Sequence, residues 1–148
     1  MTRLLTLVAF GLAIAFAPTI CEAQSQSIHV TGKIVESTLI GDPDNPKIGD
    51  QSINSVELID DSGTKVGTAT GICTLVTPPG SDALVQCLIT AVFAEGQIIF
   101  GGIAPLPNIG AVGHFGILGG TGDFRKVHGE ATLVVISPEL QEATLDLE

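Results

Sequence analysis

The sequence predicts an all-β fold: an eight-stranded antiparallel β-barrel of the up-and-down type, in a single domain. Two observations lead to this prediction. After residue 23, apolar and polar residues alternate over short stretches, and Gly, Pro and Asp residues separate these stretches. Helical periodicity is not sustained in any of them, so the pattern offers no crossover helix to join parallel strands. With 148 residues, the chain is long enough for one domain but not comfortably for two.

Each expected strand is bounded by residues that favour turns. Segment 41–50 is rich in Gly, Asp and Pro, segment 60–63 reads Asp-Asp-Ser-Gly, and segment 78–82 reads Pro-Pro-Gly-Ser-Asp. Glu95 and Gly96 form a tight turn, and 105–113 is a loop. The strands expected between the turns are 28–34, 53–60, 66–76, 83–94, 97–104, 114–118, 129–136 and 143–147.

Strands of this length fit either a sandwich or a barrel, and the third strand favours the barrel. One of its faces carries β-branched side chains from Val66 to Val76. The other face carries Gly67, Ala69, Gly71 and Cys73, which are all small. Such a face suits the inside of a narrow closed barrel, and an eight-stranded barrel has room for packed side chains or one small ligand.

Two cysteines support the pairing of the third and fourth strands. Cys73 and Cys87 each lie seven residues from Gly80, so they face each other in a hairpin centred there. We expect a disulfide between them. A bond that closes a loop of this length contributes about 3 kcal/mol, mainly by restricting the unfolded chain.

The first 23 residues have the features of a secretory signal. A short positive segment ends at Arg3, an unbroken apolar run covers 4–17, and Cys21 and Ala23 are small residues before a cleavage site. The expected division is therefore a signal peptide at 1–23 and a barrel domain at 24–148, in a secreted or periplasmic protein. A lipid anchor on Cys21 is disfavoured because Ile20, which precedes it, is not small.

The charge balance excludes several partners. The net charge is −10, and removal of Arg3 and Glu22 leaves it unchanged. Five cations cannot balance a phosphate backbone, so we expect no binding to nucleic acid and none to a membrane after signal cleavage. No cofactor motif is present. We expect no metal site either, because the acidic segment 42–45 lacks the spacing of a calcium loop. The basic residues that remain are Lys33, Lys47, Lys65, Arg125 and Lys126.

Three motifs resemble those of a known superfamily. Residues 66–73 (Val-Gly-Thr-Ala-Thr-Gly-Ile-Cys) resemble a strand of allene oxide cyclases, and 93–98 (Phe-Ala-Glu-Gly-Gln-Ile) resembles a strand–turn–strand shared by allene oxide cyclases and dirigent proteins. Residues 117–125, followed by Gly129, are similar to the dirigent signature Gly-Gly-Thr-Gly-x-Phe-x-x-Ala-Arg-Gly. The resemblance implies a calycin-like eight-stranded barrel with a hydrophobic lumen, often assembled as a homotrimer.

The glycine motif also has a physical interpretation of its own. Gly119, Gly120 and Gly122 permit positive φ angles, and Thr121 or Asp123 could cap a short helical turn. A phosphate-binding loop would instead open a long helix and carry a lysine or the Gly-x-Gly-x-x-Gly spacing, which is absent. We therefore expect a structural turn.

The resemblance to allene oxide cyclases implies four site residues. Glu36, Pro43, Asn54 and Cys73 fall in places similar to that family's glutamate, proline, asparagine and cysteine. A carboxylate in an apolar barrel favours its neutral form, which suits acid–base work. The alternative for Glu36 is a solvated strand end. Two departures weaken the cyclase assignment: the chain has no tyrosine, and a disulfide would remove the free thiol of Cys73.

The resemblance to dirigent proteins implies a second set of residues. Asp123 lies in the glycine motif, and His128 takes the place of its arginine. His128 could equally be an ordinary surface residue. Phe93 and Phe100, on neighbouring strands, are expected to contact a ligand together with Pro43 and Cys73.

Three functions are compatible with these features. The first is a binding barrel that holds a small apolar or phenolic molecule and directs its coupling or cyclisation, as dirigent proteins do. The second is an isomerase of the allene oxide cyclase kind; an enzyme activity, if present, would be an isomerase or cyclase. The third is a non-catalytic scaffold whose lumen is filled by its own side chains. Small lumen residues favour the first two, because they leave space.

Overall fold

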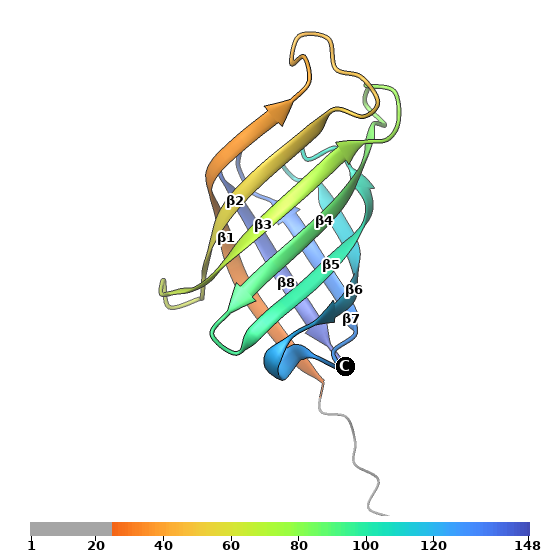
Figure 1. The fold of residues 1–148 in the computed structure, drawn as a ribbon. Coiled ribbons are helices and arrows are strands. Elements are labelled where there is room, and N and C mark those ends of the chain that lie inside the picture. The colour runs from red at the N-terminus through yellow and green to blue at the C-terminus, as the bar shows by residue number, and fades with distance from the viewer. Residues whose placement is uncertain (1–24) are drawn as a thin grey trace, which may run out of the picture.

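The computed structural model describes residues 25–148, which form a closed antiparallel barrel (Figure 1). Each strand pairs with the next one along the chain, and β8 pairs with β1 to close the sheet. The predicted signal peptide with its cleavage after Ala23 lies outside the described residues. Within 25–148, no helix has the length and apolar character needed to cross a bilayer. The strands are β1 (Gln26–Ile40), β2 (Gln51–Ile59), β3 (Lys65–Leu75), β4 (Leu84–Phe93), β5 (Gly96–Pro105), β6 (Val112–Gly120), β7 (Gly129–Val135) and β8 (Leu140–Leu147).

The fold class and strand order are confirmed, and β1, β6 and β8 are clearly longer than their local pattern predicts. β1 continues to Ile40 because a bulge between Ile34 and Glu36 lets it follow β2 along its whole length. β6 begins at Val112 and ends at Gly120, since its first residues pair with β7 and its last with β5. β8 begins at Leu140, three residues before the predicted start, because Leu140 pairs with Lys33 on β1. Pairing partners far apart in the sequence set these boundaries.

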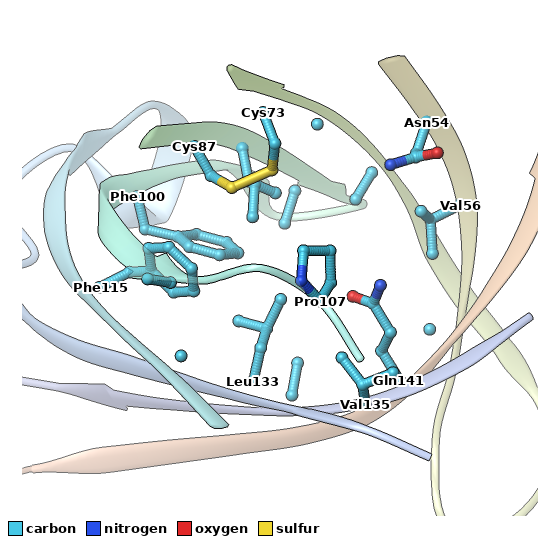
Figure 2. A pocket seen from close by; sticks show the side chains of 18 of the residues that line it. Asn54, Val56, Cys73, Cys87, Phe100, Pro107, Phe115, Leu133, Val135 and Gln141 are labelled. Carbon is cyan, nitrogen blue, oxygen red and sulfur yellow. A yellow bond between two sulfur atoms is a disulfide. The ribbon is translucent and has the colours of Figure 1, made fainter. Parts of the chain in front are cut away.

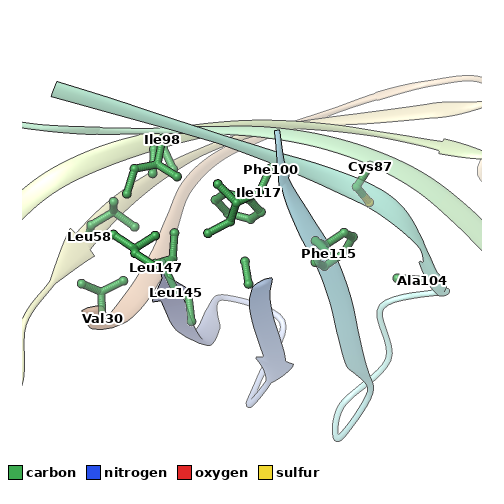
Figure 3. Packing of buried hydrophobic residues seen from close by; sticks show 14 of the residues in the cluster. Val30, Leu58, Cys87, Ile98, Phe100, Ala104, Phe115, Ile117, Leu145 and Leu147 are labelled. Carbon is green, nitrogen blue, oxygen red and sulfur yellow. The ribbon is translucent and has the colours of Figure 1, made fainter. Parts of the chain in front are cut away.

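The barrel has one closed and one open end. Figure 1 shows the turn that contains the 3₁₀ helix η1 (Gly122–Phe124) at the same end as the β4–β5 turn and the C-terminus. The opposite end carries the four loops 41–50, 76–83, 106–111 and 136–139. Val30, Ile98 and Leu145 are the largest fully buried side chains, and Figure 3 shows the apolar cluster around them.

Phe124 closes the barrel at the η1 end. Its ring is buried and meets the edge of Phe93, with ring centroids 5.9 Å apart. Backbone N–H groups hold the turn in place: Thr121 donates to the carbonyl of Gln97 at 2.9 Å, and Asp123 donates to that of Glu95 at 3.0 Å. The motif is therefore a structural turn that seals the barrel, as its glycines predicted.

The expected side-chain cap of this turn is wrong. Thr121 precedes η1, but its side chain makes no capping hydrogen bond to the helix. Its hydroxyl instead accepts a hydrogen bond from the backbone N–H of Gln97 at 3.1 Å. Tertiary packing brings this N–H group of β5 within reach of the Thr121 hydroxyl.

The predicted disulfide is present. Cys73 and Cys87 are register partners on β3 and β4, and their Cα atoms lie 4.1 Å apart. The bond crosses the hairpin between these strands, as the equal spacing about Gly80 predicts.

Candidate ligand-binding cavity

The lumen contains a cavity of about 110 Å³ to which all eight strands contribute (Figure 2). Pro105 and Pro107 line it and are also exposed to solvent, so the cavity opens at the loop-bearing end. An apolar cavity of ~150 Å³ admits one benzene molecule. The space therefore suits roughly one ring, and a larger ligand would extend through the mouth.

Most of the cavity wall is apolar. Phe100 and Phe115 lie with their ring centroids 6.2 Å apart, and the Cys73–Cys87 disulfide forms the neighbouring wall (Figure 2). The small face predicted for the third strand does face inward, because Ala69, Gly71 and Cys73 all line the cavity. These small residues are the reason that the lumen is not filled by its own side chains.

Three neutral polar side chains interrupt this wall: Ser52, Asn54 and Gln141. No Asp, Glu, Lys, Arg or His is among the lining residues in the described part of the chain. Asn54 is the fourth residue of β2 and Gln141 the second of β8, so both lie near the open end. Figure 2 shows both amides on the side of the cavity away from Phe100 and Phe115. The cavity thus has an aromatic side and an amide side.

Among the described residues, the two amides have no hydrogen-bond partner. The side-chain hydrogen bonds of residues 25–148 include none from Asn54 or Gln141. Both residues are only half-buried, so water can reach them. Each amide offers two N–H donors and a carbonyl acceptor, which leaves them available to a ligand.

The loops around the mouth carry mostly negative charge. Lys47 is the one basic residue in the four loops at this end. Two carboxylates organise the largest loop: Asp50 accepts a hydrogen bond from the backbone N–H of Lys47 at 2.8 Å, and Asp42 accepts one from that of Asp44 at 3.1 Å. The acidic residues of these loops are Asp42, Asp44, Asp50, Asp82 and Glu139.

The structure divides the residues predicted by resemblance to allene oxide cyclases. Asn54 and Cys73 line the cavity. Glu36 is exposed and is register partner of Ser55, which lies between two inward-facing residues of β2, so Glu36 points to the outer face. The apolar surroundings expected for Glu36 are therefore absent. Pro43 is exposed in the 41–50 loop and does not line the cavity. The catalytic role of Glu36 and the ligand contact of Pro43 stay predictions.

The structure also separates the other predicted site residues. Phe100 lines the cavity, whereas Phe93 packs against Phe124 at the closed end. Asp123 is exposed there and lines a separate hollow that includes Phe93. His128 is exposed at the same end, with its Nε2 3.6 Å from Oε2 of Glu148. Asp123 and His128 therefore do not share a site with Asn54, and their catalytic roles stay predictions.

Sequence reasoning missed Gln141, Pro105 and Pro107. Gln141 was hidden because the last strand was expected to begin at Ala143, two residues later. The alternation Gln141, Ala143, Leu145 is present in the sequence and could have revealed it. The two prolines lie in and beyond the end of β5, where no local pattern tells which way a loop folds.

The described part of the chain contains no cluster of side chains suited to coordinate a metal ion. Among residues 25–148, no group of three or more His, Cys, Asp or Glu side chains is placed to hold a metal ion.

The comparison that decides the family covers nearly all the described residues. Residues 25–145 match the family described as the allene oxide cyclase barrel like domain. The chain belongs to this family. No curated protein sequence matches the chain. The allene oxide cyclase-like assignment thus rests on the family match and on the closed eight-stranded barrel.

Several solved structures share this allene oxide cyclase-like barrel. A pyocyanin demethylase is 25% identical, with a TM-score of 0.74 over 83% of this chain and 100% of that one. AbnU, an exo-specific intermolecular Diels-Alderase, is 19% identical, with a TM-score of 0.71 over 84% of this chain and 98% of that one. AbmU, a Diels-Alderase from Streptomyces koyangensis, is 21% identical, with a TM-score of 0.68 over 82% of this chain and 63% of that one. At the identities of the two Diels-Alderases, the likeness shows a shared fold alone.

Proposed function

We propose that this allene oxide cyclase-like barrel binds a small apolar or phenolic molecule in its lumen and directs its coupling or cyclisation. The cavity carries the proposal, because it is open, is lined by apolar side chains and contains two amides that have no hydrogen-bond partner among residues 25–148. A scaffold with a filled lumen would not need such a space. Burial of a ring against the apolar wall would supply the binding energy, and the amides would orient it.

The lining of the cavity favours some reactions over others. No titratable side chain lines it within residues 25–148, so proton transfer by a lumen residue is not supported. The cavity could direct a reaction in three other ways. It could confine the ligand in a reactive conformation, exclude water, and supply a hydrogen bond to a carbonyl or hydroxyl group. Cyclisation and coupling of an already reactive molecule need only these. The Diels-Alderase descriptions of two similar structures agree with this class of reaction.

Export is part of the proposal. Residues 1–23 have the sequence features of a secretory signal, and a disulfide such as Cys73–Cys87 persists in oxidising compartments. Native mass spectrometry on protein from the host's exported fraction tests both parts. We expect a chain that begins at Gln24 and carries an adduct lost on denaturation. Absence of the protein from that fraction would overturn export, and failure of the protein to bind any apolar or phenolic compound supplied to it would overturn the binding function.

Closing the mouth of the cavity should abolish ligand binding. Ala111 lines the cavity at the open end, and Phe in its place would fill much of a space that holds roughly one ring. The matched control is Val112→Phe, because its neighbour Val112 is exposed on the outer face. In a titration monitored by ligand NMR, we expect Ala111→Phe to weaken binding at least tenfold and Val112→Phe to leave it unchanged. Equal affinities in the two variants would mean that the ligand binds outside the lumen.

We further propose that copies of the chain associate through the outer face of β3, β4, β5 and β6, with the trimer as the expected assembly. Apart from Lys65 at the start of β3, these four strands contain no Asp, Glu, Lys or Arg, whereas each of the other four carries at least one. Leu88, Ile103 and Leu118 are more than half exposed on this face. In a chain of net charge −10, this face lets two copies meet without opposing carboxylates.

A charge placed on this face should separate the copies. Leu88 on β4 and Val35 on β1 are apolar and exposed to a similar degree, at 52% and 55%. Leu88→Glu should yield a monomer by light scattering, because it would bury carboxylates in the contact. Val35→Glu, on the half of the barrel that already carries charge, should leave the assembly intact. A wild-type monomer at high concentration, or an assembly that survives Leu88→Glu, would contradict the proposal.

A further inference from the structure

We infer that the cavity selects a neutral ligand whose apolar part lies against Phe100 and Phe115 and whose carbonyl or hydroxyl group is held by Asn54 and Gln141. The same site excludes carboxylates of equal size. This inference rests on the proposed binding function and deepens it, because it names the chemical class of the ligand and assigns Gln141 as a specificity-determining residue.

The first step is the placement of polar and apolar groups on opposite sides. The phenyl rings of Phe100 and Phe115 lie across the cavity from the amides of Asn54 and Gln141 (Figure 2). A ligand with a ring and one polar end would therefore enter in a single orientation. The reversed orientation would place the polar group against phenyl rings and leave the amides unpaired, and both are unfavourable.

The second step is the way the fold brings the two amides to one site. Gly32 on β1 is register partner of Gln141 on β8, and on its other side it pairs with Leu58 on β2. Gly32 lines the cavity and is paired with Gln141, so β1 places no side chain beside Gln141 at this register position. Asn54, whose register partner on β1 is Ser37, lines the same cavity as Gln141, although 87 residues separate the two in the sequence.

The third step is the charge around the site. The described lining contains no Lys, Arg or His that could pair with an anion. The loops at the mouth add five carboxylates against Lys47 alone. A carboxylate ligand would lose its hydration without gaining a counter-charge, and the acidic mouth would repel it as it approached. A neutral carbonyl or hydroxyl group has neither disadvantage, because amide N–H and C=O groups satisfy it fully.

Three probes of one size test the inference: acetophenone, benzoate and ethylbenzene. They share the phenyl ring and differ at the end that would meet the amides, which is a neutral carbonyl, a carboxylate or an ethyl group. Affinities would be measured at neutral pH by ligand NMR titration. We expect the wild-type protein to bind acetophenone at least tenfold more tightly than benzoate and several-fold more tightly than ethylbenzene.

Substitutions at the amides separate their contribution from that of the apolar wall. Asn54→Leu and Gln141→Leu should lower the affinity for acetophenone to that for ethylbenzene, while ethylbenzene binding is kept. Gln26→Leu is the matched control, because Gln26 is exposed on β1, outside both the cavity and the proposed contact between copies. If Gln141→Leu fails to fold, Gln141→Met keeps the unbranched shape and replaces the amide. Gln141→Lys adds a cation to the site and should raise benzoate affinity at least tenfold, whereas Gln26→Lys should not.

The outcomes distinguish this inference from the function on which it rests. If none of the three probes binds, the lumen is not a site for small apolar molecules, and both proposals fail. If the probes bind but acetophenone and benzoate bind equally, the binding function stands and the selection of neutral ligands fails. If the preference for acetophenone survives in both Leu variants, Asn54 and Gln141 are not the selecting groups, and their assignment is overturned.

Discussion

Replacing Gly122 with alanine should lower the free energy of unfolding by about 3 kcal/mol, as a sum of backbone strain and overpacking. Gly122 adopts φ +61°, and a Cβ atom there would collide with the carbonyl oxygen of Glu95 and press on the Cα of Gly96. The β4–β5 turn would have to move away from η1. Because η1 holds Phe124 in the closed end, the variant should also expose apolar surface.

Gly63 provides the matched control for this prediction. It lies in the β2–β3 turn with φ +80°, and a Cβ atom there meets nothing within 4 Å. Gly63→Ala therefore carries the strain of a positive φ without the collision, and should cost about 1 kcal/mol. Urea unfolding followed by far-UV circular dichroism measures both variants, since the chain has no Trp or Tyr for fluorescence. Equal losses would mean that contact with the β4–β5 turn does not constrain Gly122.

Removal of the disulfide is the second large effect expected. Cys73→Ala combined with Cys87→Ala should lower the free energy of unfolding by about 3 kcal/mol, because the unfolded chain regains the freedom of a closed loop. The two cysteines are 14 residues apart in the sequence. Both line the cavity, so the double variant should also accept a bulkier ligand than the wild-type protein.

A reducing agent supplies the control for this second prediction. It should lower the stability of the wild-type protein towards that of the double variant and should leave the double variant itself unchanged. The measurement is the urea midpoint with and without the reductant. A double variant as stable as the oxidised wild-type protein would show that the β3–β4 hairpin does not depend on its cross-strand bond.

The strands were predictable because their signals are local. Period-two alternation and turn residues act over a few positions, and the barrel keeps both wherever consecutive strands pair through short turns. The inward face of β3 and the pairing of Cys73 with Cys87 followed from the same alternation and from equal spacing about Gly80. The family resemblance added the closure of the sheet, which no local pattern contains.

The glycine motif was correctly predicted to form a turn, but positive φ angles explain only some of its glycines. Gly119 and Gly122 do adopt positive φ angles, as expected. Gly120 does not have a positive φ angle. Glycine is required at this position because a Cβ atom would collide with the carbonyl of Gln97 and with Phe124. That constraint comes from a strand more than twenty residues away, and no dihedral preference of the motif itself reveals it.

By itself, the sequence determined the all-β class, the order of the strands, the small inward face of β3 and the position of the disulfide. Only the tertiary structure decided which end of the barrel is open, that Glu36 points outward and that Asn54 and Gln141 share one cavity. The bulge before Glu36 shifts the alternation by one residue, and such a shift moves a side chain from the lumen to the outer face. The two amides meet because β8 closes on β1, and contacts made by closure depend on pairings that lie far apart in the chain.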